Sequence, residues 1–187
     1  MSSTLLLSAP LTEKQCEGKV AEVDLLRSKE FTAVRRSEFL TWRAMVADYL
    51  GYLPEIVYNH VGAPQIVGST LNIGVSHTAD CVAVVLSERA CAVDVERKDR
   101  DVERISDRFI TSEERNLCSR PEDLVALWSA RECYYKLRQD RSLSMLTDIR
   151  VVEMDLTAGR VTVEDNRMQS ATLRIEEREE HFVVYII

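Results

Sequence analysis

The sequence predicts an α+β protein of two similar subdomains, each with a long helix packed on an antiparallel sheet. Residues 30–50 and 121–137 carry apolar residues at the spacing of long helices. Short runs rich in Val, Ile and Ala, separated by polar turns, occur in both halves and are typical of strands. With 187 residues, of which 45% are hydrophobic, the chain can bury a core without needing disulfides or a structural metal.

In the first half, the residues up to Ser28 alternate weakly and predict one or two strands. A helix is expected over residues 30–50, with Gly51 where a helix C-terminus favours glycine. Its apolar residues that can share a face are Val34, Leu40, Val46 and Leu50, and its arginines, which fall largely elsewhere, are Arg35, Arg36 and Arg43. After the turn signal Gly62-Ala63-Pro64 come three strand-like segments, at residues 71–76, 81–86 and 91–95.

In the second half, residues 102–109 read as helical, and Thr111-Ser112-Glu113-Glu114 matches a capping box that starts a further helix. Pro121 suits the first turn of the next helix, which should run to about Leu137. Strands are then expected at residues 151–156, 160–163, 171–175 and 181–187. We therefore expect an N-terminal subdomain at residues 1–90 and a C-terminal subdomain at residues 91–187.

Composition and charge argue against several classes of protein. The formal net charge of −7 opposes a nucleic-acid surface. No apolar run approaches the ~18 residues of a membrane helix, and the first residues lack the pattern of a secretory signal. Five cysteines without a Cys-x-x-Cys pair fit a reducing compartment better than a disulfide framework. We expect a cytoplasmic protein that binds neither nucleic acid nor membrane.

The segment from Cys91 to Glu96 places two carboxylates on one face of a strand. Side chains at i and i+2 point the same way, so Asp94 and Glu96 lie side by side while Val93 and Val95 face the core. Like charges at this spacing repel one another unless a cation or proton lies between them. Mg²⁺ commonly takes one or two carboxylates and completes its shell with water and phosphate. The alternative is a solvated strand end leading into basic residues.

The predicted helix around Trp128 carries Glu132 and Lys136 four residues apart, on one face. Such a pair can be a simple helix-stabilising ion pair worth ~0.2–0.5 kcal/mol. The neighbouring aromatic residues argue against a purely solvated face. A carboxylate beside Lys136 and Arg131 also suits the binding of a metal-bound pyrophosphate.

A third segment, from Asn72 to Thr78, reads as a buried strand that ends in the hydrogen-bonding residues Ser76, His77 and Thr78. His77 could donate a hydrogen bond to a phosphate. The alternative is a histidine that merely satisfies a turn.

Together these segments resemble the 4'-phosphopantetheinyl transferase superfamily, in particular its longer, pseudo-dimeric type that acts on carrier domains. The family shows Gly-x-Pro, then Ser-His-Ser/Thr after a strand, a Gly-Ile-Asp-Ile-Glu-like strand, and Trp-x-x-Lys-Glu-x-x-x-Lys on a helix. The chain shows the same order in Gly62-x-Pro64, Ser76-His77-Thr78, Ala92–Glu96 and Trp128–Lys136. It departs from the family at Ala63, where a basic residue is usual, at Arg131, where lysine is usual, and at residues 137–142, which lack the usual glycine-rich turn.

The resemblance implies a pseudo-two-fold 4'-phosphopantetheinyl transferase fold and a Mg²⁺-dependent transferase. Such an enzyme moves the 4'-phosphopantetheine group of coenzyme A to a serine of an acyl or peptidyl carrier protein and releases 3',5'-ADP, a holo-[acyl-carrier-protein] synthase reaction. The implied metal ligands are Asp94, Glu96 and Glu132. Glu132 or Glu114 would accept the serine proton, and Lys136 and Arg131 would neutralise phosphoryl charge. The implied coenzyme contacts are Ser76, His77, Arg131 and Lys136, with Arg36 and Arg43 as candidates for the 3'-phosphate unless they form a solvated face.

Carrier proteins present an acidic helix, so a locally basic surface is expected on this chain. Its candidate residues are Arg104, Arg108 and Arg115, although acidic neighbours make a self-compensated surface an alternative. Other functions that fit the residues are a homologue that binds coenzyme A or a carrier without turnover, a metal-dependent phosphohydrolase, and a pure interaction module. Because both halves lie in one chain, a monomer is expected.

Overall fold

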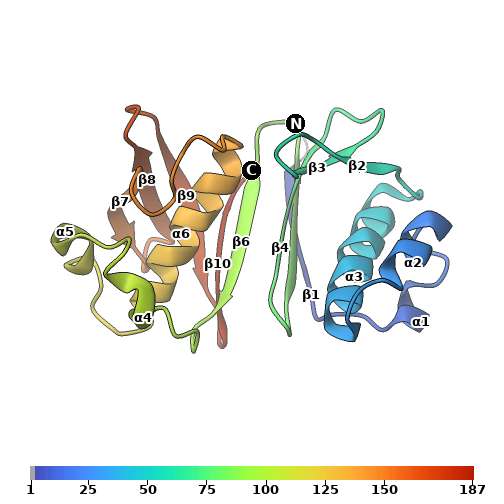
Figure 1. The fold of residues 1–187 in the computed structure, drawn as a ribbon, viewed down its shortest axis with the longest axis horizontal. Helices are drawn as coiled ribbons and strands as arrows, with labels where there is room; N and C mark the ends of the chain where they lie inside the picture. The colour runs from blue at the N-terminus through green and yellow to red at the C-terminus, as the bar shows by residue number, and fades with distance from the viewer. Residues whose placement is uncertain (1–2) are drawn as a thin grey trace. The chain divides into compact units, whose positions relative to one another are not determined.

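The computed structural model describes residues 3–187 and divides the chain into two compact units. Among the described residues, unit 1 comprises residues 3–91 with Ile187, and unit 2 comprises residues 92–186. Met1 and Ser2, the first residues of the expected N-terminal subdomain, lie outside the described residues. Each unit contains a five-stranded antiparallel sheet and a long helix, α3 or α6 (Figure 1). This confirms the predicted α+β class.

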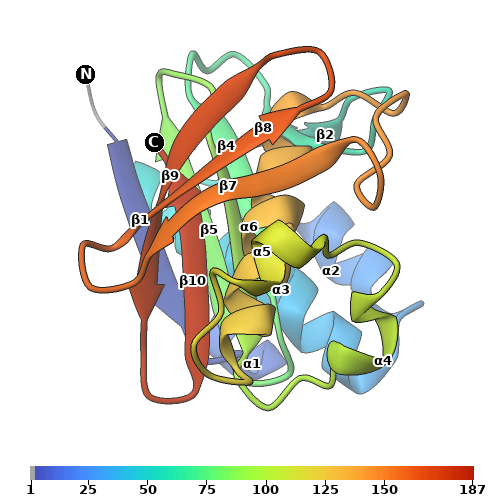
Figure 2. The same cartoon turned by 90° about the vertical axis from the view of Figure 1, so that its left-hand side faces the viewer.

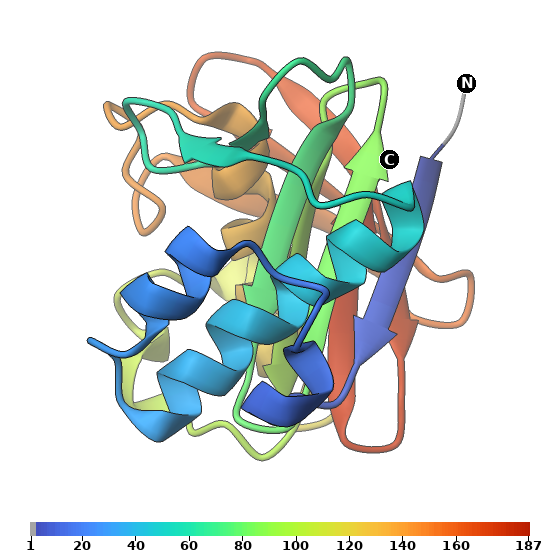
Figure 3. The same cartoon turned by 90° about the vertical axis from the view of Figure 1, so that its right-hand side faces the viewer.

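Unit 1 builds its sheet in the order β1-β5-β4-β3-β2. Figure 3 shows the long helix α3 lying across this sheet, with the short helices α1 and α2 beside it. The elements are β1 (Ser3–Ser8), α1 (Glu13–Cys16), α2 (Glu22–Ser28), α3 (Ala33–Leu50), β2 (Ile56–Tyr58), β3 (Pro64–Ile66), β4 (Asn72–His77) and β5 (Val82–Ser87).

The N-terminal region differs from its prediction, because one strand is followed by two short helices. Thr12 starts α1 through a capping box in which its side chain accepts from the Gln15 N–H and its own N–H donates to the Gln15 side chain. Acidic residues also occupy the first turn of α2, where they interact favourably with the helix dipole. These local signals outweigh the weak alternation of the sequence.

Helix α3 is buried on two sides. Trp42 and Val46 pack with the sheet residues Ile73 and Val84. Phe39, Leu40 and Ala44 pack instead with residues from the segment of α1 and α2. Val34, which was expected on the buried face, is exposed in the first turn of the helix.

Unit 2 builds its sheet in the order β6-β10-β9-β8-β7, and helix α6 packs against it (Figure 2). The core cluster contains Leu127, Ala130 and Tyr134 from α6, together with Val161 and Leu173 from the sheet. The elements are β6 (Ala92–Arg97), α4 (Glu103–Ser106), α5 (Ser112–Arg115), α6 (Asp123–Arg138), β7 (Ile149–Asp155), β8 (Arg160–Asp165), β9 (Ser170–Glu177) and β10 (His181–Ile186). None of the helices within residues 3–187 combines the length and hydropathy that crossing a bilayer requires.

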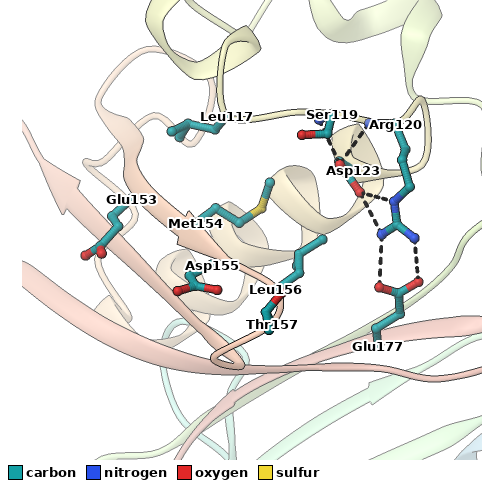
Figure 4. Close-up of a pocket in the computed structure, with 10 residues that line it drawn as sticks. All are labelled: Leu117, Ser119, Arg120, Asp123, Glu153, Met154, Asp155, Leu156, Thr157 and Glu177. Carbon is teal, nitrogen blue, oxygen red and sulfur yellow. Dashed lines mark hydrogen bonds and ion pairs between the residues drawn. The ribbon is translucent and has the colours of Figure 1, made fainter.

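The start of α6 is tied to β9 through Arg120, as Figure 4 shows. Its guanidinium donates to Asp123 Oδ1 at 2.9 Å and to both carboxylate oxygens of Glu177, each at 2.9 Å. Lys98 Nζ also lies 2.8 Å from Glu177 Oε1. The Arg120 guanidinium and the Lys98 ammonium lower the pKa of Glu177 to about 2.

The contribution of Glu177 to stability should therefore depend on pH. Because its pKa is lower in the folded chain than the ordinary value of 4.5, the stability it adds is fully present above that value and is lost as the pH falls toward 2. Glu177→Gln should lower the free energy of unfolding by about 1 kcal/mol or less at pH 7. Urea unfolding at pH 7, 5 and 3 should show the difference from wild type narrowing with acidity. Glu179→Gln, in the turn that follows β9, is the control. A difference from wild type that stays constant to pH 3 would contradict the assignment.

Candidate functional site

Asp94 and Glu96 lie on the face of β6 that carries the core of unit 2. In the β6–β10 register, Asp94 is opposite Val184 and Glu96 is opposite Phe182. Residues directly opposite one another share a face of the sheet, and both partners belong to the core cluster that includes α6. The two acids therefore lie side by side on the helix-covered face.

This orientation corrects the expectation that Val93 and Val95 face the core while the acids point away from it. Ala92, which shares the face of Asp94 and Glu96, belongs to the core cluster of unit 2. Val93 and Val95 are buried on the opposite face of the strand. The alternation of side chains along the strand was predicted correctly. The face with the two acids was wrongly taken as the one turned away from the core, because charged side chains are usually exposed.

Helix α6 supplies a hydrogen-bond donor to each acid. Ser129 Oγ donates to Asp94 Oδ2 at 2.8 Å, and Trp128 Nε1 donates to Glu96 Oε1 at 3.2 Å. Asp94 is 3% exposed and Glu96 is 8% exposed, so each needs such partners. Neighbouring positions of α6 thus fix the orientation of both carboxylates.

Two basic side chains balance the charge of the acids. Lys136 Nζ lies 2.6 Å from Asp94 Oδ1. Arg100 pairs with Glu96, and its guanidinium carbon lies 5.3 Å from the centre of a Trp128 ring. Against the effect of burial, Asp94 raises the pKa of Lys136 above its ordinary value, so the ammonium stays charged.

Glu132 belongs to the same electrostatic cluster. Burial raises the pKa of its carboxyl group, and the charge of Asp94 raises it further, while Lys136 and Arg100 act in the opposite direction. The sequence predicted that Glu132 and Lys136 share a helix face. The structure adds that this face is turned toward β6 and that Arg100, which the sequence analysis did not name, is part of the cluster.

The donor set of this cluster suits a divalent ion. Carboxylate oxygens are the ligands that Mg²⁺ prefers, and the effect of Asp94 on the pKa of Glu132 reflects repulsion that a bound cation would relieve. In residues 3–187, no three or more His, Cys, Asp or Glu side chains are grouped so that they could hold one ion. Asp94 and Glu96 are instead bound to protein donors. The three-ligand site therefore stays a prediction that the chemistry of the donors supports.

Arg131 and Glu114 form a buried ion pair, which differs from the roles expected for them. Arg131 is 1% exposed, and its guanidinium lies 2.5 Å from Glu114 and donates to the carbonyl oxygens of Met145 and Ile149. Neither side chain presents its charge to solvent. We therefore assign Arg131 to holding α6 in place rather than to contacting a phosphate.

Glu114 is occupied by protein donors on both of its oxygens. Oε1 accepts from the Val151 N–H at 2.8 Å as well as from Arg131, and Oε2 accepts from the Thr111 N–H at 2.9 Å. The last contact completes the capping box of α5 that the sequence predicted. A carboxylate fixed in this way joins α5, α6 and β7 and is poorly placed to accept a substrate proton.

In unit 1, His77 at the end of β4 contacts two residues of α3. His77 Nδ1 lies 3.2 Å from Glu38 Oε2, and His77 Nε2 contacts the guanidinium of Arg35. Arg35 is also 3.4 Å from Glu38 and keeps nearly half of its side chain exposed. The sequence analysis did not assign a role to Arg35 or Glu38, although their i,i+3 spacing on a helix is a usable signal.

Ser76 and His77 do not share a face of the sheet. They are consecutive residues of a regular strand, and their side chains point to opposite faces. Ser76 is buried, whereas His77 is partly exposed. His77 is therefore the better candidate for contact with a ligand.

Arg43, expected as a candidate for the 3'-phosphate, is 2% exposed. Its guanidinium carbon lies 3.5 Å from the centre of the Phe39 ring and 4.0 Å from that of a Trp42 ring. Its Nε lies 3.0 Å from Asp24 Oδ2, and its Nη2 donates to Tyr58 Oη at 3.0 Å. Arg43 is therefore a buried structural cation that joins α3 to α2.

Arg36, the other candidate for the 3'-phosphate, is also used by the fold. Its Nε donates to the Ser28 carbonyl oxygen at 3.0 Å, and its Nη2 donates to that of Lys29 at 3.2 Å. These contacts close the C-terminal end of α2, whose last carbonyl groups need donors. Arg36 therefore has a capping role in the fold, and its expected contact with the 3'-phosphate stays a prediction.

The arginines expected to meet a carrier protein are largely paired with nearby acids. Arg104 Nε lies 2.8 Å from Asp101, and Arg115 lies 3.3 Å from Glu103 and 3.6 Å from Asp107. The charges of these two arginines are thus compensated by neighbouring acids, which was the alternative to a basic surface.

A pocket of about 720 Å³ opens in unit 2, beside the start of α6 (Figure 4). It holds four acidic residues and one arginine, Arg120, whose guanidinium is held by Asp123 and Glu177. The pocket is thus poorly suited to an anionic phosphate. Its lining residues are Leu117, Ser119, Arg120, Asp123, Glu153, Met154, Asp155, Leu156, Thr157 and Glu177.

Comparison with known proteins identifies relatives of this chain. The sequence model of the 4'-phosphopantetheinyl transferase superfamily matches residues 90–186, which include the whole of unit 2. The 4'-phosphopantetheinyl transferases AcpT of Salmonella typhimurium (strain LT2) and of Salmonella typhi are each 29% identical to the chain over 125 residues. Each match covers 62% of this chain and 65% of the relative, so the chain spans less than two thirds of the length of these relatives.

Replacing Arg131 should test the buried ion pair. Arg131→Lys keeps the charge, but one ammonium on a lysine stem cannot reproduce the planar fork that serves Glu114 and two carbonyl groups, so we expect a loss of about 1–3 kcal/mol in the free energy of unfolding. Arg131→Met should cost about 3–5 kcal/mol because Glu114 would remain buried and unpaired. Urea unfolding measures both. The exposed Arg141→Lys is the control, and wild-type stability of Arg131→Lys would contradict the assignment.

Proposed function

The chain belongs to the 4'-phosphopantetheinyl transferase superfamily, and on that premise we propose that it transfers the 4'-phosphopantetheine group of coenzyme A to a serine of a carrier protein. The observation that carries this proposal is the cluster of Asp94, Glu96, Glu132 and Lys136, which joins β6 to α6 within the matched region. In this reaction the serine oxygen attacks the pyrophosphate of coenzyme A, and 3',5'-ADP leaves. Catalysis of such transfers depends on positioning and on charge neutralisation. Fatty-acid, polyketide and peptide carriers all satisfy this chemistry.

In this proposal Asp94, Glu96 and Glu132 hold Mg²⁺. When bound, the ion supplies Lewis-acid stabilisation of charge on the pyrophosphate. The chain's own contribution is to bury and orient the ligands, which it does through Ser129 for Asp94 and Trp128 for Glu96.

Lys136 and Glu132 perform the remaining chemistry of unit 2. Lys136 stays protonated and neutralises charge on the phosphoryl oxygens, as its raised pKa supports. Glu132 accepts the serine proton in this proposal, because its carboxylate belongs to the same electrostatic cluster as Asp94 and Lys136. Glu114 is given no part in proton transfer, since Arg131 and two backbone N–H groups already occupy its oxygens.

The coenzyme contacts are assigned to His77 and Arg35. Both are partly exposed nitrogen donors held together by Glu38. They replace Arg36 and Arg43, whose guanidinium groups serve the fold. The proposal further takes the chain as a monomer and places it in the cytoplasm. Its five free cysteines support the reducing compartment.

The transferase proposal is tested by incubating the chain with an apo-carrier protein, coenzyme A and Mg²⁺ and measuring the mass of the carrier. We expect the wild type to add one phosphopantetheine group, and Asp94→Asn and Glu132→Gln to slow the reaction at least ~100-fold, since they remove ligands and the proton acceptor. Asp99→Asn, just beyond β6, is the control. Coenzyme binding without modification of several carriers would favour a homologue that has lost turnover, and undiminished rates in both variants would contradict the assigned site.

The coenzyme contacts are tested by calorimetric titration with coenzyme A. His77→Ala and Arg35→Ala should each weaken binding about tenfold, as expected for the loss of a hydrogen bond to a charged group. His60→Ala, which changes another histidine of unit 1, should leave the affinity unchanged. If His77→Ala and Arg35→Ala both bind coenzyme A with the affinity of the wild type, the two residues are not part of the binding site.

A further inference from the structure

Arg100 is a cation that the proposed reaction does not use, and it lies at the metal-ligand cluster. It follows Glu96 by four residues, just beyond the end of β6. Its guanidinium pairs with Glu96 and lies over Trp128. The side chain is 42% exposed, so it can leave the carboxylate without opening the core.

The oxygen that Arg100 binds is already shared with another donor. Glu96 Oε1 accepts from Arg100 and from Trp128 Nε1. A carboxylate oxygen offers about two lone-pair sites, so these two donors use the acceptor capacity of Oε1. The indole of Trp128 is buried and fixed, whereas Arg100 is the movable partner.

The same arrangement is repeated on the neighbouring acid. Asp94 is bound by Lys136 and Ser129, as Glu96 is bound by Arg100 and Trp128. Each carboxylate thus has one neutral donor from α6 and one protein cation. Since a divalent ion is positive as well, it and the protein cation are alternative counter-charges for the same carboxylate.

We propose that Arg100 competes with the divalent ion for Glu96 and so sets the ion affinity of the site. This inference rests on the proposed function, because it requires an ion held by Asp94, Glu96 and Glu132. Binding of the ion displaces the guanidinium from Glu96. Arg100 thereby lowers the affinity for the free ion and acts as a positioning residue rather than a catalytic one.

Arg97 provides a matched control at the same strand end. It follows Glu96 directly, so its side chain points to the opposite face of β6. It pairs with Asp99 at 2.8 Å and with Glu180 at 3.6 Å. Replacing Arg97 removes the same charge from nearly the same place without removing a contact to Glu96.

The test is calorimetric titration of the full chain with Mn²⁺, whose oxygen preference matches that of Mg²⁺. Arg100→Gln should raise the affinity about threefold to fivefold over wild type, the upper part of the range expected for losing a half-exposed competing pair. Arg97→Gln should change it less than twofold, and Arg100→Lys should return it close to wild type. The titrations are run at about 0.3 M NaCl, where long-range repulsion between the arginine and the ion is largely screened.

The outcomes separate this inference from the proposed function. An unchanged or reduced affinity in Arg100→Gln, or an equal rise in Arg97→Gln, overturns the competition. If the wild type also modifies a carrier protein, the transferase proposal survives that result. Tighter Mn²⁺ binding in Arg100→Gln alone supports the competition even where no carrier is modified, whereas absence of Mn²⁺ binding by the folded wild type overturns the inference. Circular dichroism confirms that each variant is folded.

Discussion

The burial of two carboxylates between β6 and α6 is the constraint on which unit 2 depends. A charge taken out of water costs several kcal/mol unless it is paired and hydrogen-bonded. Here Asp94 is met by Ser129 and Lys136, so the helix must present both residues to the strand at the correct height. A slip of β6 by one residue would turn Val93 toward α6 in place of Asp94 and leave these donors without their acceptor. The polar contacts therefore fix the register that apolar packing alone leaves less defined.

A second requirement is that α6 itself must not rotate or slide, and Arg131 meets it. Its guanidinium reaches Glu114 and two carbonyl groups that precede or begin β7. Lysine, with a single ammonium group, could not serve three acceptors that lie in different directions. Glu114 in turn belongs to the capping box of α5, so a local helix start and a long-range anchor use one carboxylate. Since Glu132 follows Arg131 directly in α6, holding the arginine also holds the proposed proton acceptor.

The sequence predicted the long helices, the strands β4 to β10 and the capping box of α5, because each has a periodicity or a local signal of its own. It missed β2 and β3, which have only three residues each and little room for a pattern. It placed Asp94 and Glu96 on one face correctly but could not show that α6 covers that face, since the covering residues lie more than thirty positions away. Arg43 looked like part of a solvated face for the same reason. In the folded chain Asp24 lies close to Arg43 and forms an ion pair with it, a contact between distant residues that the sequence does not show.

Burial and the number of protein partners separate the structural cations from the functional ones. The chain has 19 arginines among its 24 basic residues, and a planar guanidinium can satisfy several acceptors at once. Arg43 and Arg131 do this inside the protein and are nearly inaccessible. Arg35, Arg100 and Lys136 keep a third or more of their side chains exposed, and each lies against a titratable group that the proposed reaction uses.

A cation that solvent can still reach can exchange its carboxylate or imidazole partner for a phosphate, or it can give up that partner to a metal ion. A buried one cannot do so without unfolding its surroundings. Arg131 therefore serves the fold in this chain, and in the proposed reaction the charge that faces substrate is assigned to Lys136.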